Sequence, residues 1–334
     1  MFIDSHPVVS LTVALCLLFL TVGHIRYSIP FSALNSTSCI AHRQFCGPSN
    51  VSPAWIYKMH PWTNKKGKYS QGSQDLYLHR IFAVIGSTNR YFVEFGFNEP
   101  SYTSGGSGAN TRNLYQKGWR GLLLDGDREN AEINLQKHFL FANNIAQIFA
   151  QYNVPKELDY LSVDMDSHDL WVFRAILEAG YRPRVITTEY NANYPLTHAL
   201  TLIDPTLIGN GSVPSDFSFE FTHCAWGASA KALFLVATTY GYKMVGRIDG
   251  LDLVWLRADL ISDCFLVPEF EWFFRDIKLG SRVHNRQKDD RALRMIVDYE
   301  TFVKTRNLTA SNAVARDVLR RSKLDCFYTI RKII

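Results

Sequence analysis

The sequence carries little excess charge. Its formal net charge at pH 7 is +5 over 334 residues, and the Lys and Arg residues are spread along the chain. One group of basic residues stands out near the C-terminus: Arg316, Arg320, Arg321, Lys323, Arg331 and Lys332. A solvated helix face explains this group better than a nucleic-acid arm, so we expect no nucleic-acid partner.

The sequence also lacks internal repeats, long low-complexity tracts and a recognisable zinc motif. His223 and Cys224 have no flanking ligands at zinc-site spacing, and nothing pairs them into a nucleophilic triad. His223 remains a candidate for lining a pocket. The composition, 47% hydrophobic and 20% charged, is that of a folded globular protein with ample material for a core.

Charge is absent from an N-terminal segment, residues 8–23, which reads VVSLTVALCLLFLTVG. With its neighbours, this segment approaches the roughly 20 apolar residues needed to cross a bilayer. A cleaved signal peptide would carry Lys or Arg before its apolar segment, and none precedes this one. We therefore expect an uncleaved signal anchor within residues 1–25, a stem over residues 26–73, and a single-pass membrane protein of the Golgi or endoplasmic reticulum.

Two patterns conflict on the side of the membrane that the remaining chain occupies. Arg26 and Arg43 follow the apolar segment and favour the cytosol. Cys39 and Cys46 suit a small disulfide loop in an oxidising lumen. The lumen is also favoured by Asn-x-Ser/Thr triplets at Asn35, Asn50, Asn210 and Asn307. We choose the lumenal side, which predicts a glycoprotein.

From Gln74 onward, short apolar runs alternate with segments of helical periodicity. The runs predict strands over residues 91–96, 121–125, 146–150, 160–166 and 184–190, and a closing pair over 242–248 and 251–257. The intervening segments predict helices over residues 75–86, 110–118, 128–139, 169–180 and 227–241. This alternation predicts an α/β domain over residues 74–260, with a mostly parallel sheet and helices on both faces. A mostly helical extension is expected over residues 261–334.

Acidic residues and glycines stand where these strands end, at the edge where parallel sheets bind ligands. Gly96 would let a ligand approach the backbone, and Glu94 would orient that loop or bind a ligand ammonium. Asp125, followed by Gly126, ends the next strand. A carboxylate there can accept both hydroxyl hydrogens of an adenosine ribose, although an Asp-Gly turn would explain the same residues.

At these residues the chain resembles class I S-adenosylmethionine-dependent methyltransferases, and specifically the FkbM-type family. The resemblance is carried by SQGSQDLYLHRIF, YFVEFGFNEPSYTSGGSGANTRNLYQKGWRGLLLDGD, YLSVDMDSHDLWVFRAIL and RPRVITTEYNANYP. It implies a Rossmann-like methyltransferase fold and S-adenosylmethionine as cofactor. It also implies a cofactor site at Glu94, Gly96, Asp125 and Gly126, with residues 144–147 flanking the adenine. The chain departs from the pattern after Gly96, where no second glycine follows until the SGGSG run at 104–108.

The next two strand ends carry the residues expected to act on the acceptor. Asp164 and Asp166 follow one strand, and Glu189 and Asn191 follow the next. Asp164, Glu189 and Asn191 would offer oxygen ligands to Mg²⁺, which would lower the pKa of a substrate hydroxyl. Alternatively, one of the catalytic candidates Asp164, Asp166 and Glu189 acts as general base. Asp169 is expected to cap the following helix.

A dense aromatic run, PEFEWFF at residues 268–274, is either an exposed recognition loop or a packing element. Aromatic side chains at this density are more often buried, so we expect packing.

The patterns together predict an O-methyltransferase that acts on a hydroxyl group of a glycan, a lipid or a small molecule. One alternative is a catalytically silent, methyltransferase-shaped membrane protein that binds a partner. Another is a lumenal nucleotide-sugar glycosyltransferase, whose D-x-D motif would be Asp164-Met165-Asp166.

Overall fold

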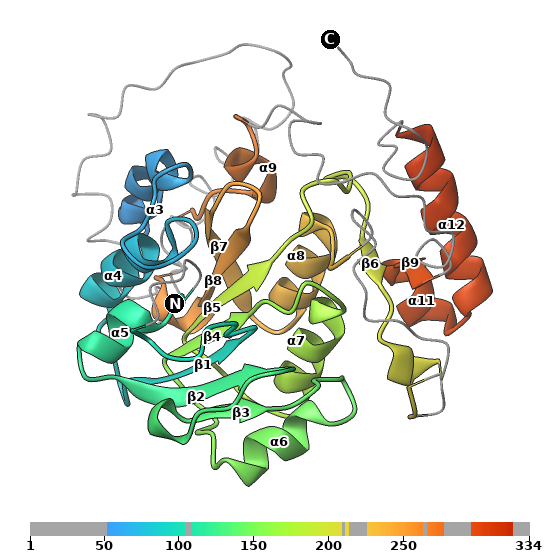
Figure 1. Ribbon diagram of the computed structural model, residues 1–334. Helices are drawn as coiled ribbons and strands as arrows, with labels where there is room; N and C mark the ends of the chain where they lie inside the picture. The colour runs from blue at the N-terminus through green and yellow to red at the C-terminus, as the bar shows by residue number, and fades with distance from the viewer. Residues whose placement is uncertain are drawn as a thin grey trace, which may run out of the picture. The chain divides into compact units, whose positions relative to one another are not determined.

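The structure is a computed structural model, and it describes residues 52–103, 109–208, 211–213, 226–262, 266–276 and 295–322. All of these residues belong to one compact unit, Cys46–Ile334 (Figure 1). Every cysteine of the chain, the 104–108 glycine run and His223 lie outside the described residues.

Within the described part of the chain, seven strands form one sheet in the order β3-β2-β1-β4-β5-β8-β7. Their bounds are β1 (Tyr91–Phe95), β2 (Arg120–Asp125), β3 (Leu135–Lys137), β4 (Tyr160–Val163), β5 (Val185–Glu189), β7 (Tyr242–Arg247) and β8 (Asp252–Arg257). Strands β1 to β5 pair in parallel, whereas β8 runs antiparallel to both β5 and β7. Every residue of β4 and β5 is buried, as expected for central parallel strands covered on both faces.

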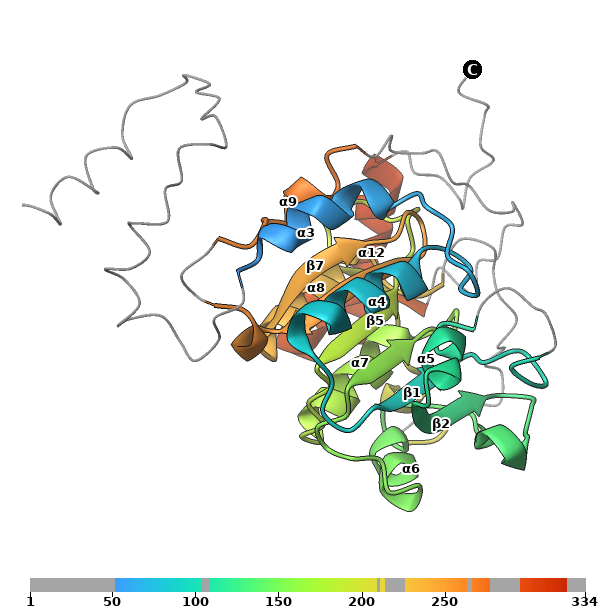
Figure 2. The ribbon, with the colours of Figure 1, turned by 90° about the vertical axis from the view of Figure 1, so that its left-hand side faces the viewer.

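Helices cover both faces of this sheet. Their bounds are α3 (Ala54–Met59), α4 (Gln74–Ile85), α5 (Arg112–Gln116), α6 (Ile145–Gln151), α7 (Asp169–Glu178), α8 (Ala230–Thr239) and α9 (Phe270–Phe273). Figure 1 shows α4 and α5 on one side of the sheet and α6, α7 and α8 on the other. Figure 2, turned by 90°, shows α3 and α4 lying across the face near β7. The described residues also form four short 3₁₀ turns: η1 (His60–Trp62), η2 (Ala131–Ile133), η3 (Pro205–Leu207) and η4 (Ala258–Leu260).

This architecture confirms the predicted α/β fold class. The first five strands follow the order in which doubly wound sheets bind nucleotides, with the topological switch between β1 and β4. The mainly parallel sheet, closed by the antiparallel β8, fits the Rossmann-like methyltransferase fold. Doubly wound sheets bind ligands at this switch point, so the carboxyl ends of β1 and β4 are the candidate position for a site in this chain.

Two predicted elements are wrong. The helix expected over residues 128–139 is the turn η2 followed by the edge strand β3, and Asn134 has a left-handed φ of 54° between them. The strand expected over residues 146–150 is helix α6. Its buried residues Ile145, Ile148 and Phe149 follow helical spacing, which a five-residue apolar window cannot distinguish from a strand.

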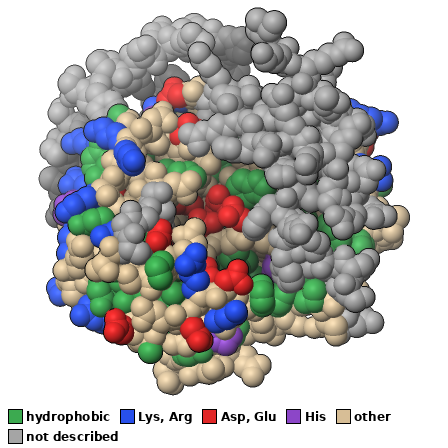
Figure 3. Space-filling model, viewed as in Figure 1, with side chains coloured by type: hydrophobic (Ala, Val, Ile, Leu, Met, Phe, Trp, Pro, Cys, Tyr) green, Lys and Arg blue, Asp and Glu red, His purple; other side chains and the backbone are tan. Residues whose placement is uncertain are grey.

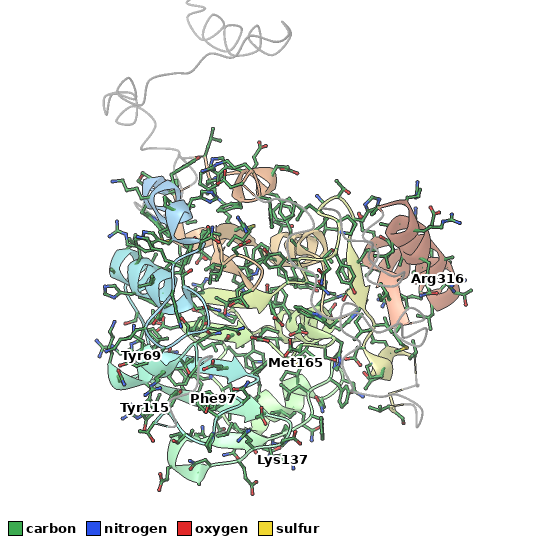
Figure 4. The ribbon with its side chains drawn as sticks, turned by 45° about the horizontal axis from the view of Figure 1, so that its top comes forward. Tyr69, Phe97, Tyr115, Lys137, Met165 and Arg316 are labelled. Carbon is green, nitrogen blue, oxygen red and sulfur yellow. The ribbon has the colours of Figure 1, made fainter. Side chains whose placement is uncertain are left out.

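A second, two-stranded sheet joins β6 (Leu200–Leu202) to β9 (Ile296–Asp298). Helices α11 (Tyr299–Thr305) and α12 (Leu308–Arg321) follow β9. A separate cluster of buried side chains, which includes Leu200, Ile296 and Leu319, holds these elements together. The basic side chains on α12 are exposed, and Figure 4 labels Arg316 on its outer surface.

The predicted localisation, a single-pass membrane protein of the Golgi or endoplasmic reticulum, is corrected by the described helices. None of them is both long and apolar enough to span a bilayer. The longest, α12, has 14 residues and two arginines in its last turn, whereas a span needs about 20 mostly apolar residues. The apolar segment at residues 8–23, on which the prediction rested, lies outside the described residues.

The aromatic run at residues 268–274 is a packing element, as predicted. Phe270, Phe273 and Phe274 are buried in and around α9. Their rings pack against β7 and α8, so most of the aromatic surface of the run is buried, and the accessible edges of Phe270 and Phe274 line a groove.

Candidate active site

The loops that follow β1 and β4 touch at the topological switch point. Gly96 has a φ of +65°, and a Cβ atom at this position would lie 2.3 Å from the backbone oxygen of Asp164. Only glycine satisfies both conditions, because any other side chain would force the two loops apart. Figure 4 labels Phe97 and Met165, which mark these two loops.

Glu94, near the end of β1, shapes the loop that returns toward α5. Its carboxylate accepts hydrogen bonds from the backbone N–H of Asn110 at 2.7 Å and of Thr111 at 3.1 Å. The Thr111 hydroxyl donates a further hydrogen bond to the same group. Burial raises the pKa of Glu94 to about 7 despite these bonds. Because both oxygens are engaged, Glu94 orients the loop that carries Asn110 and Thr111.

Asp125 ends β2 with one oxygen engaged and the other open. Its Oδ1 accepts hydrogen bonds from the backbone N–H groups of Asp127 and Arg128 at 2.8 and 2.9 Å, which forms the expected turn. Its Oδ2 accepts no hydrogen bond from any residue in the described ranges. The turn therefore fixes the carboxylate and leaves one oxygen for a ligand.

An aromatic ring that the sequence did not identify lies beside this turn. Phe139 is 53% exposed, and a Cβ atom on Gly126 would lie 3.2 Å from its ring. The backbone of His138 donates a hydrogen bond to the Asp125 carbonyl, which holds the segment before Phe139 against the end of β2. Glycine at position 126 thus leaves room for this ring beside the Asp125 turn. Nothing in the local sequence distinguishes Phe139 from a core residue.

Three carboxylates converge at the ends of β4 and β5. One oxygen from each of Asp164, Asp166 and Glu189 lies within 4.8 Å of the other two. Figure 3 shows acidic side chains gathered near the middle of this face. Oε2 of Glu189 is buried and has no hydrogen-bond partner among the described residues. A buried acceptor without a donor is unfavourable, so this oxygen is suited to a bound cation.

A fourth acidic residue, Asp252, lies at the start of β8 directly opposite Glu189 in the sheet register. Gln74, the first residue of α4, donates a hydrogen bond of 2.7 Å from its Nε2 to Oδ2 of Asp252. Burial raises the pKa of Asp252 to about 7. Burial and the neighbouring acidic groups raise the pKa values of Asp164 and Glu189 well above their usual range. Folding therefore concentrates carboxyl groups here, and no Lys or Arg pairs with them among the ion pairs of the described residues.

Two further predicted residues, Asp169 and Asn191, make hydrogen bonds that hold the neighbouring loops. Asp169 is the first residue of α7, and its carboxylate accepts hydrogen bonds from the backbone of Met165 and Ser167 at 2.7 and 2.9 Å. It thus orders the loop after β4, whereas we expected it to cap the helix. The amide of Asn191 donates to the Trp226 carbonyl and accepts from the Asn193 backbone.

The structure therefore brings together Asp164 and Glu189, two of the three predicted metal ligands, and adds Asp166 as the third carboxylate. Asp252 and Gln74 were missed. The acidic residue preceding the run LVWLR was visible in the sequence, but only the antiparallel pairing of β8 places it opposite Glu189.

Comparisons with known proteins add little beyond this geometry. No protein-family model matches the chain, and a search of curated proteins found no match. A search of solved structures found an O-methyltransferase from Bacillus cereus in complex with SAH. It shows 13% sequence identity and a TM-score of 0.29 over 66% of this chain and 94% of that chain.

The same search found the MycE methyltransferase of the mycinamycin biosynthetic pathway, in complex with Mg and SAH and, in a second structure, also with mycinamycin VI. These show 12% identity and a TM-score of 0.34, and the first of them covers 66% of this chain and 57% of that chain. At such low similarity, no activity, ligand or family passes from these proteins to this chain.

Proposed function

We propose that this protein is an S-adenosylmethionine-dependent methyltransferase that transfers a methyl group to a hydroxyl oxygen. One observation carries the proposal. The Asp125 carboxylate at the end of β2 is held by a turn through one oxygen only. It lies at the same edge of the sheet as the three converging carboxylates at the ends of β4 and β5. Doubly wound sheets bind nucleotides and carry out chemistry at this edge.

The residues after β1 and β2 suit the adenosine half of the cofactor. Oδ2 of Asp125 would accept hydrogen bonds from the ribose hydroxyls, and the exposed Phe139 ring would offer a stacking surface for adenine. Gly96 and Gly126 keep side chains out of the space beside these groups. Glu94 supports the site by fixing the loop at Asn110 and Thr111. The bound cofactor would supply an activated methyl group on a sulfonium centre.

The acidic centre suits a hard divalent cation such as Mg²⁺. The donors are three carboxylates of the type that Mg²⁺ prefers, and Oε2 of Glu189 is buried without a partner. Asp164, Asp166 and Glu189 would hold the ion, while Asn191 keeps the loop after β5 in place. A bound cation would lower the pKa of an acceptor hydroxyl at neutral pH.

The chain's own contribution to the reaction is alignment and charge placement. Asp125 and the two loops at the switch point orient one reactant, and the acidic centre orients the other. If the cation is absent, a carboxylate of Asp164, Asp166 or Glu189 would act as general base, because burial raises the pKa values of Asp164 and Glu189. We further propose membership of the FkbM-type family, on the sequence segments that carry the resemblance.

The acceptor is proposed only as a hydroxyl compound. The preference for a glycan rested on the membrane anchor, and with the localisation corrected it has no separate support. A small molecule or a lipid headgroup that offers a hydroxyl group fits the acidic centre equally well.

The main rival is a nucleotide-sugar glycosyltransferase that uses Asp164 and Asp166 as its D-x-D motif. Thermal unfolding of the full-length protein separates the two proposals. S-adenosylmethionine, S-adenosylhomocysteine and Mg²⁺ are expected to raise the melting temperature. UDP-glucose or UDP-galactose with Mn²⁺ is expected to have no effect beyond that of Mn²⁺ alone. Stabilisation by the nucleotide sugars but not by S-adenosylmethionine would overturn the methyltransferase proposal, and stabilisation by neither would favour a catalytically silent protein.

A further inference from the structure

A separate groove lies between α8, α9 and the segment that follows β5. It has a volume of about 320 Å³, at the lower end of the range for small-molecule sites. Its lining residues are Leu196, Thr197, Lys231, Phe270, Glu271 and Phe274. None of these residues has a role in the acidic centre or in the cofactor site.

The groove and the acidic centre share the chain segment that follows β5. Leu196 and Thr197 belong to the segment that continues from Glu189. The ring of Tyr190, the next residue after Glu189, packs edge-on against Phe274 at a centroid distance of 6.0 Å. Tyr190 and the segment after it therefore link the groove to the end of β5, which carries one of the three converging carboxylates.

One cation in the groove lacks an acidic partner. The Lys231 ammonium lies 5.5 Å from the centroids of both the Phe234 and Phe270 rings, and Lys231 is half-buried. It makes no ion pair or hydrogen bond with any residue in the described ranges. Ring faces stabilise an ammonium but leave its N–H donors unsatisfied, so Lys231 can accept an anionic ligand group.

The other charged groups near the groove do not compete for this role. The Arg247 guanidinium lies over Phe274, but it is bonded to the Asp249 carboxylate and to the Phe273 carbonyl, both at 2.7 Å. Glu271 is exposed, so water solvates its carboxylate. The walls, formed by Phe270, Phe274 and Leu196, are apolar.

From these contacts we propose that the groove binds the non-reacting part of the methyl acceptor, and that this part is a small organic acid with an apolar or aromatic body. The carboxylate of the acceptor pairs with Lys231, its body packs on Phe270 and Phe274, and its hydroxyl group points toward the acidic centre. The assignment of the bound acid as a methyl acceptor rests on the proposed methyl transfer. Binding of the acid in the groove does not depend on that reaction.

The probe pair is 4-hydroxycinnamate and its primary amide, titrated calorimetrically into the full-length protein. The acid is expected to bind at least tenfold more tightly than the amide, because only the acid forms a charge-assisted hydrogen bond with Lys231. Lys231→Met keeps the apolar stem and is expected to abolish this difference. Lys231→Arg is expected to retain it, and Glu271→Gln is the matched control, expected to leave acid binding equal or stronger.

S-adenosylmethionine is titrated into the same four proteins. Unchanged cofactor affinity in Lys231→Met, together with lost acid selectivity, would support the groove as an acceptor site. Equal binding of acid and amide by the unmodified protein, no binding of either, or full acid binding by Lys231→Met would overturn the proposal. Selective acid binding without any cofactor binding would leave the groove intact and overturn methyl transfer instead.

Discussion

At the scale of single residues, Asp164 and Glu189 combine burial with like charge. Both are drawn close to Asp166 and Asp252, and none of these four carboxyl groups pairs with a basic side chain in the described part of the chain. Such an arrangement costs folding free energy unless protons or a cation neutralise it. Because functional sites commonly retain destabilising groups, this cost supports the proposal that the carboxyl groups bind a ligand.

Neutral replacements should therefore stabilise the metal-free protein. Asp164→Asn and Glu189→Gln are expected to raise the melting temperature by several degrees in EDTA and to abolish Mg²⁺ binding measured by calorimetry. Asp127→Asn, an exposed carboxylate beside the Asp125 turn, is the control and should change neither quantity. Lower stability in both variants with intact Mg²⁺ binding would contradict the assignment.

Phe139 provides a second test at this scale. Phe139→Ala is expected to weaken S-adenosylmethionine binding about three- to tenfold, because an aromatic stack contributes roughly 0.5–1.5 kcal/mol. Leu207→Ala removes another exposed apolar side chain, of 39% exposure, and should leave the affinity unchanged. An equal loss in both variants would point to general destabilisation instead of stacking.

Sequence reasoning at the residue scale succeeded where a side chain directly follows a buried strand. Asp125, Asp164, Asp166 and Glu189 all stand at such ends, and the parallel sheet carries them to one edge. It failed for Asp252, which begins an antiparallel strand. The position of that residue depends on pairing with β5 across more than sixty intervening positions, Glu189 to Asp252, and local sequence contains no signal for such pairing.

At the scale of elements, the tight contact between the loops after β1 and β4 makes the site rigid. Gly96→Ala is expected to destabilise the protein by more than about 3 kcal/mol, because it adds a steric clash to an unfavourable φ angle. Gly118→Ala is a matched control: φ is +84° there, but nothing lies within 4 Å of the added Cβ. We expect a loss of only roughly 1–2 kcal/mol for it.

Denaturant unfolding of both variants measures the difference. Similar destabilisation by the two substitutions would show that the Asp164 carbonyl can move away from the added Cβ at little cost in free energy. The contact between the two loops would then not be rigid. Cofactor binding should also fall more in Gly96→Ala, since the displaced loops carry both halves of the site.

The two mispredicted elements show a limit that belongs to this scale. Strand β3 has three residues and pairs with β2. Three residues are too few to show the alternation of apolar and polar side chains that predicts a strand. Helix α6 has seven residues, and its buried positions resemble an apolar run. Elements whose central residues are buried in an unbroken pattern, such as α7, β4 and β5, were predicted correctly because local pattern and tertiary packing agree.

At the scale of the whole molecule, raised pKa values couple stability to pH. The pKa values of Glu94 and Asp252 are raised to about 7 by burial, whereas an unfolded carboxyl group titrates near about 4. Between these values the folded protein binds more protons than the unfolded chain, so stability falls as pH rises. The melting temperature in EDTA is therefore expected to decrease between about pH 5 and about pH 7.5.

Mg²⁺ should reverse much of this loss at the upper end of the window, because the cation binds the deprotonated carboxylates. Asp252→Asn should show a shallower dependence on pH than the unmodified protein. A melting temperature that rises steadily across the window, or that ignores Mg²⁺ at its upper end, would contradict the charge balance described for the acidic centre.

The central claim is that the carboxyl edge of the sheet binds S-adenosylmethionine through Asp125. Calorimetric titration of the cofactor into the full-length protein and its Asp125→Asn variant tests this claim most directly. Asparagine keeps the oxygen that accepts from Asp127 and Arg128, so the turn survives and only the carboxylate is lost. We predict micromolar binding that weakens about tenfold to a hundredfold in the variant. No binding by the folded, unmodified protein, or equal binding by both proteins, would contradict the account.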